Sequence, residues 1–214
     1  MPRTAVGVPP ELTRRRNQVL RPRDAASVYA HPRAELARLT RTGALRHIAT
    51  GYYVLSPPDR WGDDRWIPDV NSVALGIAQV DYGPDVALMG ISAARLHGAI
   101  PRALAVAIVA VPKQRPALDT DAGRIVFVKR DATRLDIERI DTPLATGWVT
   151  TIEQTLIDLA ARPTLGGLAE QDSVEAIRAL ASRADWDLVR QLARGQHKPS
   201  AARTAARLAG NSHA

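Results

Sequence analysis

The chain of 214 residues contains no cysteine. Disulfide bonds, thiolate metal sites and cysteine nucleophiles are therefore excluded, and the composition is compatible with a reducing compartment. Aromatic residues make up only 4% of the chain, so a hydrophobic core must consist mainly of alanine, leucine, valine and isoleucine. Because hydrophobic residues still account for 45% of the sequence, a sizeable core can form.

Long apolar runs are also missing. None approaches the roughly 20 residues of a membrane-spanning helix. The first ten residues lack the apolar segment of a secretory signal peptide. We therefore expect a cytoplasmic protein without a membrane partner.

The common motifs of cofactor and catalytic sites are absent as well. The sequence has no P-loop, no dinucleotide-binding G-x-G-x-x-G and no G-x-S-x-G. Its five histidines show no spacing typical of metal ligands. From these absences we expect no cofactor, no metal ion, no catalytic residue and no enzymatic activity.

A few acidic residues and one histidine remain as weak candidates for chemistry. Asp119 and Asp121 form a D-x-D pair in an expected loop, but no suitable Gly-Ser loop precedes them, so a nucleotidyltransferase metal site is not expected. Asp136 and Glu138 resemble part of a nuclease carboxylate cluster, but the lysine of such a cluster is missing. His97 lies near the end of a predicted short helix, where a packing or capping role is more common than catalysis.

The net charge of +7 is confined to the N-terminus. Residues 1–51 hold ten arginines, no lysine and three acids, which together already give +7. The remainder carries 19 basic and 19 acidic residues. A positive charge gathered at one end of a chain favours contact with a polyanion. The two parts of the chain are therefore expected to have different functions.

The apolar pattern of the basic segment begins with two predicted helices. Residues 1–9 are expected to form a mobile arm. From Pro10 onward a first helix would place Leu12, Val19 and Leu20 on one face. Asp24 is suited to cap a short second helix, because its carboxylate can accept hydrogen bonds from the first-turn amides.

A third helix and a hairpin follow. The helix is predicted over residues 33–42, with Leu36 and Leu39 facing inward and Gly43 in the left-handed position after it. Two β-rich runs, 45–48 and 52–55, flank a Thr-Gly turn and predict a hairpin. Three short helices followed by a hairpin is the order of a winged helix-turn-helix domain.

The third predicted helix has the composition of a recognition helix. Ala34 and Ala37 on its outer face are small enough to let the helix approach base edges, and the flanking arginines can reach guanine or phosphate. The hairpin carries a further arginine and a histidine that can contact the DNA backbone or the minor groove. We expect DNA contacts from Arg14, Arg15, Arg16, Arg33, Arg38, Arg41, Arg46 and His47. The alternative is that these side chains form only a solvated surface.

The second part of the chain begins after a linker at residues 56–62. Its pattern predicts a helix from Pro68 to about Val80, a short helix at 91–98 capped by Ser92, and several strands. The strands are expected at 86–89, 104–111, 124–129, 135–140 and 147–150. They suggest a small, mostly antiparallel sheet.

Four helices are predicted at the C-terminal end. Thr151 and Gln154 fit a capping box for the first of them. Asp172 or Ser173 is expected to open the second, Asp185 to cap the third and Ser200 the fourth. The fold class is therefore α+β, with a winged helix-turn-helix DNA-binding domain at 1–56 and an α+β domain that faces a protein partner at 57–214.

Three segments resemble a known family. They are RLTRTGALRHIATGYYVL at 38–55, ISAARLHG at 91–98 and VTTIEQTLIDL at 149–159. Their content and order are similar to those of AbiEi-type antitoxins. Residues 164–214 carry no motif of this family.

The resemblance implies an antitoxin of an AbiE or MenA-like system. Its winged helix would bind inverted repeats in the double-stranded DNA of its own promoter and repress transcription. Two copies would occupy the DNA, and these can be monomers in solution. The second domain would counteract a cognate toxin with a nucleotidyltransferase fold. The alternatives are a degenerate relative of Vsr-like nucleases, which share the three motifs, and an interaction module that does not bind DNA.

Overall fold

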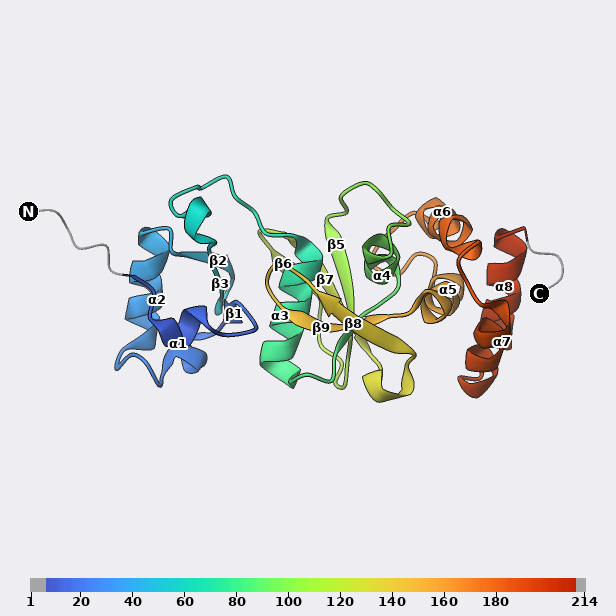
Figure 1. Ribbon diagram of the computed structural model, residues 1–214, viewed down its shortest axis with the longest axis horizontal. Coiled ribbons are helices and arrows are strands. Elements are labelled where there is room, and N and C mark those ends of the chain that lie inside the picture. The colour runs from blue at the N-terminus through green and yellow to red at the C-terminus, as the bar shows by residue number, and fades with distance from the viewer. Residues whose placement is uncertain (1–6, 211–214) are drawn as a thin grey trace, which may run out of the picture.

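The computed structural model describes residues 7–210, which form an elongated molecule with the N-terminal helices at one end and the C-terminal helices at the other (Figure 1). A six-stranded sheet and helix α3 (Val70–Tyr82) lie between the two ends. The described chain is an α+β structure with eight α-helices and two sheets. Of the arm expected at residues 1–9, residues 1–6 lie outside the described part.

The basic segment forms two helices, a short 3-10 helix and three strands. In chain order they are α1 (Pro10–Thr13), β1 (Val19–Leu20), η1 (Pro22–Ala25), α2 (Pro32–Arg41), β2 (Leu45–Ala49) and β3 (Tyr52–Leu55). The predicted third helix and the hairpin are confirmed. Leu36 and Leu39 are buried on α2, and Gly43 follows the helix with a φ of +76°.

The prediction that the first helix extends through Val19 and Leu20 is wrong. Helix α1 ends at Thr13, and the two apolar residues form β1, which pairs antiparallel with β3. Both side chains are fully buried, but they belong to different hydrophobic clusters. Neighbouring residues that point to opposite sides have the period of a strand, not of a helix.

The predicted helix with Asp24 as its N-cap is also wrong. Asp24 lies within η1, and its carboxylate accepts a hydrogen bond from the backbone N–H of Arg21 at 2.7 Å. The carboxylate therefore satisfies a free amide before the 3-10 turn. The next α-helix is α2, which begins at Pro32.

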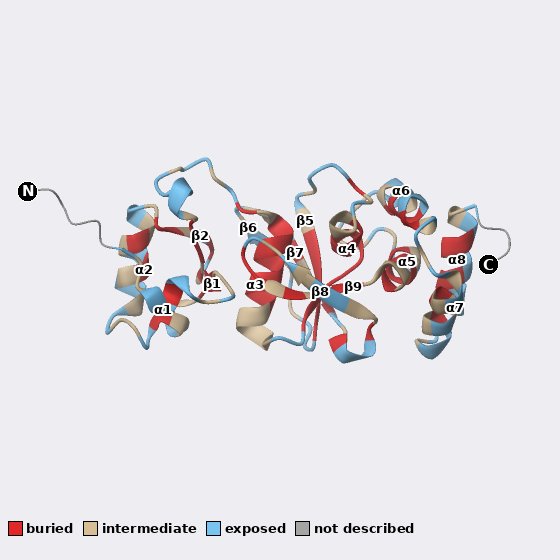
Figure 2. Ribbon diagram, in the orientation of Figure 1, coloured by how far each residue is buried: buried red, intermediate tan, exposed pale blue. Residues whose placement is uncertain are grey.

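The small sheet, with the order β1-β3-β2, is buried on both faces. On one face Leu20, Leu45 and Leu55 share a hydrophobic cluster with α1 and α2. On the other face Val19 and Val54 share a cluster with α3 and the large sheet. Buried residues are accordingly found in the small sheet, in α3 and in the large sheet (Figure 2). The predicted boundary between 56 and 57 thus does not separate two cores.

Strand β1 approaches α3 closely at Gly76. A Cβ atom at that position would lie 2.3 Å from Val19 Cγ2 and 2.9 Å from Asn17 Oδ1. The side chain of Asn17 also donates a hydrogen bond to the carbonyl of Gly76 at 2.9 Å. Glycine on α3 therefore permits the direct contact between the two parts of the chain.

The large sheet is mixed, and most of its strand pairs are antiparallel as predicted. Its strand order is β6-β7-β5-β4-β9-β8. The strands are β4 (Ala87–Leu88), β5 (Val106–Val111), β6 (Leu118–Thr120), β7 (Gly123–Lys129), β8 (Ile137–Asp141) and β9 (Thr146–Thr150). The β5–β7 and β4–β9 pairs are parallel, and the other three pairs are antiparallel.

Strand β6 occupies a segment predicted to be a loop. It pairs with β7 at the edge of the sheet, where Asp119 is opposite Arg124. The two side chains form an exposed ion pair at 3.2 Å. A cross-strand charge pair of this kind favours an edge strand that has little apolar content of its own.

Both faces of the large sheet are covered. In β5, Ala107 and Val109 belong to the cluster that contains α3, whereas Ile108 and Ala110 belong to the cluster formed with the C-terminal helices. The unbroken apolar run of this strand follows from burial on both sides. Within residues 7–210, no helix has the length and apolar composition needed to cross a membrane.

Five helices follow on the second face of the large sheet, where α4 and α5 contact the strands and the other three pack on them at the far end of the molecule. They are α4 (Ile91–Leu96), α5 (Ile152–Ala161), α6 (Glu170–Ala181), α7 (Trp186–Gly195) and α8 (Pro199–Leu208). The Thr151 hydroxyl accepts from the amide of Gln154 and caps α5, and Asp185 caps α7, as predicted. The other predicted contact of the capping box, in which the Gln154 side chain reaches back to the N-cap residue, is wrong. The Gln154 side chain donates to Asp158 instead.

Other predicted helix starts differ from the structure. Ser92 lies within α4, and its hydroxyl accepts from the backbone N–H of Ile108 at 2.8 Å, so it joins the helix to β5 and does not cap it. Ser200 lies inside the first turn of α8. Helix α6 begins at Glu170, two residues before Asp172.

Candidate nucleic-acid interface

Helix α2 presents the surface that the sequence assigned to DNA bases. Arg33, Ala34, Ala37 and Arg41 are exposed, opposite the buried leucines. Within residues 7–210, neither Arg33 nor Arg41 forms an ion pair. The helix therefore offers two uncompensated guanidinium groups with only small side chains between them.

Arg38, the third predicted base contact on α2, is engaged within the helix. Its Nε atom lies 2.8 Å from the Glu35 carboxylate, and both side chains are about one-third exposed. An i,i+3 pair of this kind is weak in water, with a strength of roughly 0.2–0.5 kcal/mol. Phosphate can therefore displace Glu35 from Arg38 at small energetic cost.

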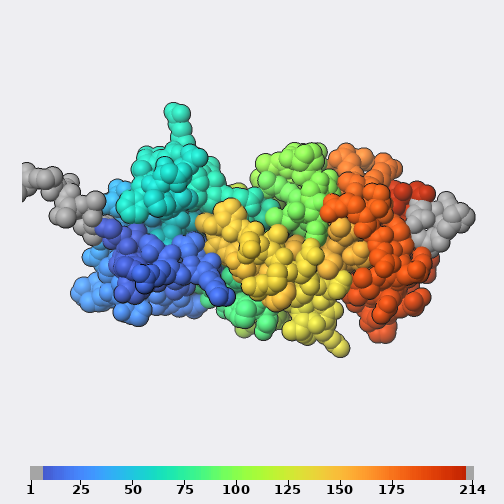
Figure 3. Space-filling model, in the orientation of Figure 1, coloured from blue at the N-terminus to red at the C-terminus, as the bar shows by residue number. Residues whose placement is uncertain are grey.

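Three further predicted contacts follow α1. Arg14 and Arg16 are exposed, whereas Arg15 is half-buried. The buried Leu12 of α1 belongs to the same cluster as the leucines of α2. These arginines therefore lie at the same end of the molecule as the exposed face of α2, in the blue region of Figure 3.

The hairpin places its two predicted DNA contacts on opposite faces of the small sheet. Arg46 points toward the second part of the chain, where Nη1 donates to the carbonyl of Asp64 at 3.1 Å and Nη2 lies 3.9 Å from the Asp121 carboxylate. His47 is exposed, and its ring packs edge-on against Tyr53. In this arrangement the Arg46 guanidinium contacts groups of the second part of the chain near the surface, whereas His47 is directed away from them.

The tip of the hairpin is attached to the large sheet. The backbone N–H of Asp121, in the turn between β6 and β7, donates to the carbonyl of Ile48 at 3.0 Å. Strands β2 and β6 are also neighbours. The hairpin is therefore held by the second part of the protein and does not project as a free wing.

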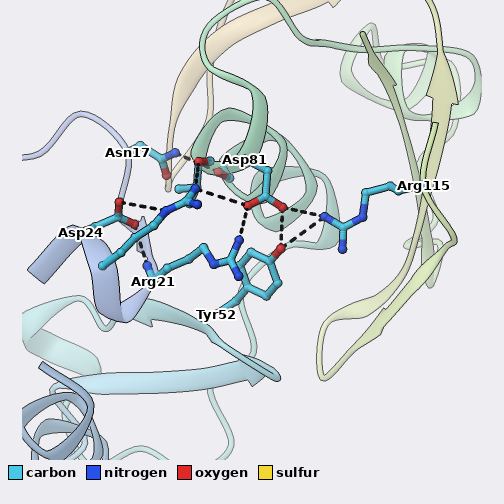
Figure 4. A network of polar contacts seen from close by, with 9 residues as sticks. Asn17, Arg21, Asp24, Tyr52, Asp81 and Arg115 are labelled. Atoms are coloured by element: carbon cyan, nitrogen blue, oxygen red, sulfur yellow. Dashed lines mark hydrogen bonds and ion pairs between the residues drawn. The ribbon is translucent and has the colours of Figure 1, made fainter. Parts of the chain in front are cut away.

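Two more arginines of the basic segment converge on Asp81 of α3 (Figure 4). Arg21 Nη1 lies 2.7 Å from one carboxylate oxygen, and Arg23 Nη2 lies 3.7 Å from the same oxygen. Arg115 Nη1 lies 2.6 Å from the second oxygen, which also accepts a hydrogen bond from the Tyr52 hydroxyl. One carboxylate thus joins η1, the hairpin and the segment after β5.

The side chain of Tyr52 is enclosed by the charged groups of this network. Burial raises the pKa of the Tyr52 hydroxyl, and the hydrogen bond to Asp81 adds to the increase while Arg115 opposes it. The guanidinium of Arg21 also lies over the Tyr52 ring, 5.0 Å from its centre. The phenol therefore remains a neutral donor that holds the hairpin on α3.

Apart from Arg38, which pairs with Glu35, the described arginines of the basic segment divide into two groups. Arg21, Arg23 and Arg46 contact acids or carbonyls of the second part of the chain. The group without an acidic partner within residues 7–210 consists of Arg14, Arg15, Arg16, Arg33 and Arg41. Sequence reasoning missed this division, because the decisive partner, Asp81, lies about sixty positions from Arg21.

The residues of the weaker enzymatic alternative are also close in space. His97 Nδ1 lies 3.6 Å from the Glu138 carboxylate, and Nε2 donates to the carbonyl of Thr150 at 2.7 Å. Asp136 accepts from the Thr151 hydroxyl at 2.7 Å. With both ring nitrogens directed at protein groups and the side chain 9% exposed, His97 fits a structural role that links α4 to β8 and β9.

No group of three or more His, Asp or Glu side chains suited to a metal ion occurs within residues 7–210. Comparison of the sequence with known protein families finds no family that matches, and comparison with curated proteins finds no match either. We therefore infer function from the residues, from their geometry and from the three segments that resemble an antitoxin family.

Proposed function

We propose that the protein is a DNA-binding antitoxin that represses its own promoter, with α2 as the recognition helix of a variant winged helix-turn-helix whose hairpin packs on the second part of the chain. The observation that carries the proposal is the exposed face of α2, where Arg33 and Arg41 have no acidic partner and flank Ala34 and Ala37. Small residues between arginines allow a helix to enter the major groove, and an arginine can pair with guanine through two hydrogen bonds.

The arginines after α1 support the same assignment. Arg14 and Arg16 are exposed at the same end of the molecule and suit contacts to phosphate, which position a protein on DNA without reading sequence. Arg46 has no such role in this proposal, because its guanidinium is bound to Asp64 and Asp121. The base contacts are therefore assigned to Arg33 and Arg41, with Arg38 available after release of Glu35.

A truncation that removes residues 1–56 does not provide a clean test. It would strip Val19, Tyr52 and Val54 from the cluster that they share with α3 and would leave Asp81 with fewer partners. Point substitutions on the exposed face of α2 avoid this damage, because the side chains of Arg33 and Arg41 make no buried contact.

The double variant R33Q/R41Q is expected to bind its upstream promoter DNA about 100-fold more weakly than the wild type, since each base-reading arginine contributes ~1–3 kcal/mol. Fluorescence anisotropy with labelled promoter duplex at fixed salt measures the change. The matched control is R203Q/R207Q, which removes the same charge from two exposed positions on α8. Wild-type affinity in R33Q/R41Q, or an equal loss in both variants, would show that α2 does not read the DNA.

Neutralisation is tested separately in cells. Co-expression of the full-length chain with the nucleotidyltransferase-fold toxin encoded next to it is expected to restore growth. R33Q/R41Q should restore growth equally when expressed from an unrelated promoter, because the proposal assigns toxin control to the second part of the chain. Colony counts measure the result. Growth arrest that neither version relieves would contradict the antitoxin assignment and favour an interaction module.

A further inference from the structure

A second basic region lies away from α2, between the large sheet and the C-terminal helices. It is a groove of about 1290 Å³ between the end of β7, the 3-10 helix η3 (Ala132–Arg134) and the turn from α7 to α8. In Figure 1 and Figure 3 this region lies at the lower edge, between the yellow η3 segment and the red C-terminal helices. The DNA-binding proposal makes no use of it.

The side chains that line the groove carry a net positive charge. Its cationic side chains are Lys129, Arg130, Arg134, Arg162 and Lys198, and His197 joins them. Asp85 and Asp131 are the acids of the lining. Asp131 is occupied in capping η3, where it accepts from the backbone N–H and the hydroxyl of Thr133. Among the lining residues the cations therefore exceed the acids by three, and by two once the buried Asp158 beneath them is included.

One buried carboxylate organises the floor of the groove. Asp158 is 2% exposed, and a single one of its oxygens lies 3.2 Å from Arg130 Nη1 and 3.7 Å from Lys198 Nζ. Arg130 Nη2 donates to Gln196 at 3.1 Å, and Gln196 is bonded in turn to Gln154. Two cations are thus fixed in place by one negative charge, which leaves a preorganised excess of positive charge.

Lys198 is the less satisfied of the two cations. Within residues 7–210 its ammonium group has no hydrogen-bond acceptor, since the Asp158 oxygen is beyond hydrogen-bond distance. Burial lowers the pKa of Lys198, and the nearby Arg130 and Arg162 lower it further against the pull of Asp158. A bound anion would relieve this repulsion and accept the free donors.

The backbone adds to the positive character of the site. Lys198 is the N-cap residue of the ten-residue helix α8, which has no side-chain cap and no acid in its first turn. The helix dipole places partial positive charge at this end of α8. Pro199 has no N–H, and the amides of Ala201 and Ala202 donate to the Lys198 carbonyl, so side chains must supply the hydrogen bonds to an anion. The preceding residue, His197, has a φ of +56° and is the one non-glycine residue with positive φ in the described chain. This costly conformation brings Gln196, His197 and Lys198 to the same wall.

We propose that this groove binds a ligand that carries two or more linked phosphates and has the size of a nucleotide. Arginine forks match phosphate oxygens in geometry, and Arg130, Arg134 and Arg162 line the groove together with Lys198. The volume exceeds the need of a single phosphate. Tyr82, Pro112 and Leu135 supply an apolar part of the lining on which a flat ring can pack.

The proposal does not depend on DNA binding, because the groove lining contains no residue of α2 or of the segment after α1. Arg134 and Arg162 are the residues to change. Both are exposed, and neither forms an ion pair within the described residues, so their removal spares the floor around Asp158.

Isothermal titration calorimetry with the full-length protein tests the site. The ligands are adenosine triphosphate and inorganic tripolyphosphate, with citrate as a carboxylate of similar charge. Both phosphate compounds are expected to bind more tightly than citrate. R134Q/R162Q should bind them about 10-fold more weakly or worse, since a charge-assisted hydrogen bond is worth ~1.5–3 kcal/mol. R203Q/R207Q, which removes the same charge from exposed positions of α8 outside the groove lining, should bind them like the wild type.

Thermal unfolding of each variant verifies that it is folded. Tighter binding of adenosine triphosphate than of tripolyphosphate would support a role for the apolar lining as well as for the cations. Citrate binding equal to that of the phosphates would overturn the proposal, as would unchanged affinity in R134Q/R162Q or the absence of binding by either phosphate compound. An equal loss in both arginine variants would also overturn it, because it would indicate attraction to net charge alone.

Discussion

Replacement of Gly43 with alanine is expected to lower the free energy of unfolding by about 3 kcal/mol or more, from backbone strain and overpacking together. Gly43 has a φ of +76°, which a residue with a Cβ atom adopts at a cost. That Cβ would also lie 2.3 Å from the backbone nitrogen of Gly62 and 2.7 Å from its Cα. Backbone atoms cannot rotate away as the end of a flexible side chain can.

Gly51 provides the matched control for this substitution. Its φ of +81° imposes the same kind of strain, but a Cβ there would meet no atom within 4 Å. G51A should therefore lose only the strain, about 1–2 kcal/mol. For a chain of this size the G43A loss corresponds to a fall in Tm of roughly 6–12 °C. Circular dichroism melting curves measure both values, and equal melting temperatures for the two variants would refute the role of the contact with Gly62.

The second large effect is expected at Asp81. D81N should destabilise the protein by about 3 kcal/mol, which is near the lower limit for breaking a buried ion pair. The Asp81 side chain is 11% exposed, and its loss of charge would leave Arg21 and Arg115 next to each other without a counter-ion. Urea unfolding at neutral pH measures the change in the free energy of unfolding.

An exposed ion pair gives the comparison for D81N. Asp119 is 78% exposed and its partner Arg124 is 55% exposed, so D119N should change the free energy of unfolding by no more than about 1 kcal/mol. A D81N effect as small as that of D119N would mean that the network in Figure 4 does not hold the two parts of the chain together.

Segments with one consistent period were predictable from the sequence. Helix α2 combines leucines at i and i+3 with a glycine after its last turn, and the hairpin has β-rich runs around a Thr-Gly turn. Strand β5 is an unbroken apolar run because both of its faces are buried. In these elements local propensity and the packing of the whole fold favour the same structure.

The errors occurred where a distant segment determines the local structure. Val19 and Leu20 form a strand because β3 and α3 lie on either side of them, and two residues do not reveal a period. Strand β6 depends on its pairing with β7. Ser92 was expected to cap a helix, but its hydroxyl accepts a hydrogen bond from the amide of Ile108 on β5.

The candidate interface was predictable in part for the same reason. Arg33 and Arg41 lie on a helix whose exposed face follows from its own leucines, so their positions could be inferred from the sequence. Arg46 was assigned to DNA because it lies on the hairpin, but the position of Asp121 decides where it points. The groove around Asp158 combines residues from β7, α5 and the turn before α8, so no local sequence pattern predicts it.

The attachment of the small sheet to the rest of the protein also has a consequence for the order of folding during synthesis. The backbone N–H of Gln18 donates to the carbonyl of Leu144, and Ile48 accepts from Asp121. A nascent chain therefore cannot complete the surroundings of its first strand until residue 144 has been made. At ~5–20 residues per second this takes roughly 4 to 18 s after residue 56 is added. During that interval α3 can already pack on the small sheet, and the cluster that supports α2 lies within residues 8–55, but the hydrogen bonds to Leu144 and Asp121 are not all available.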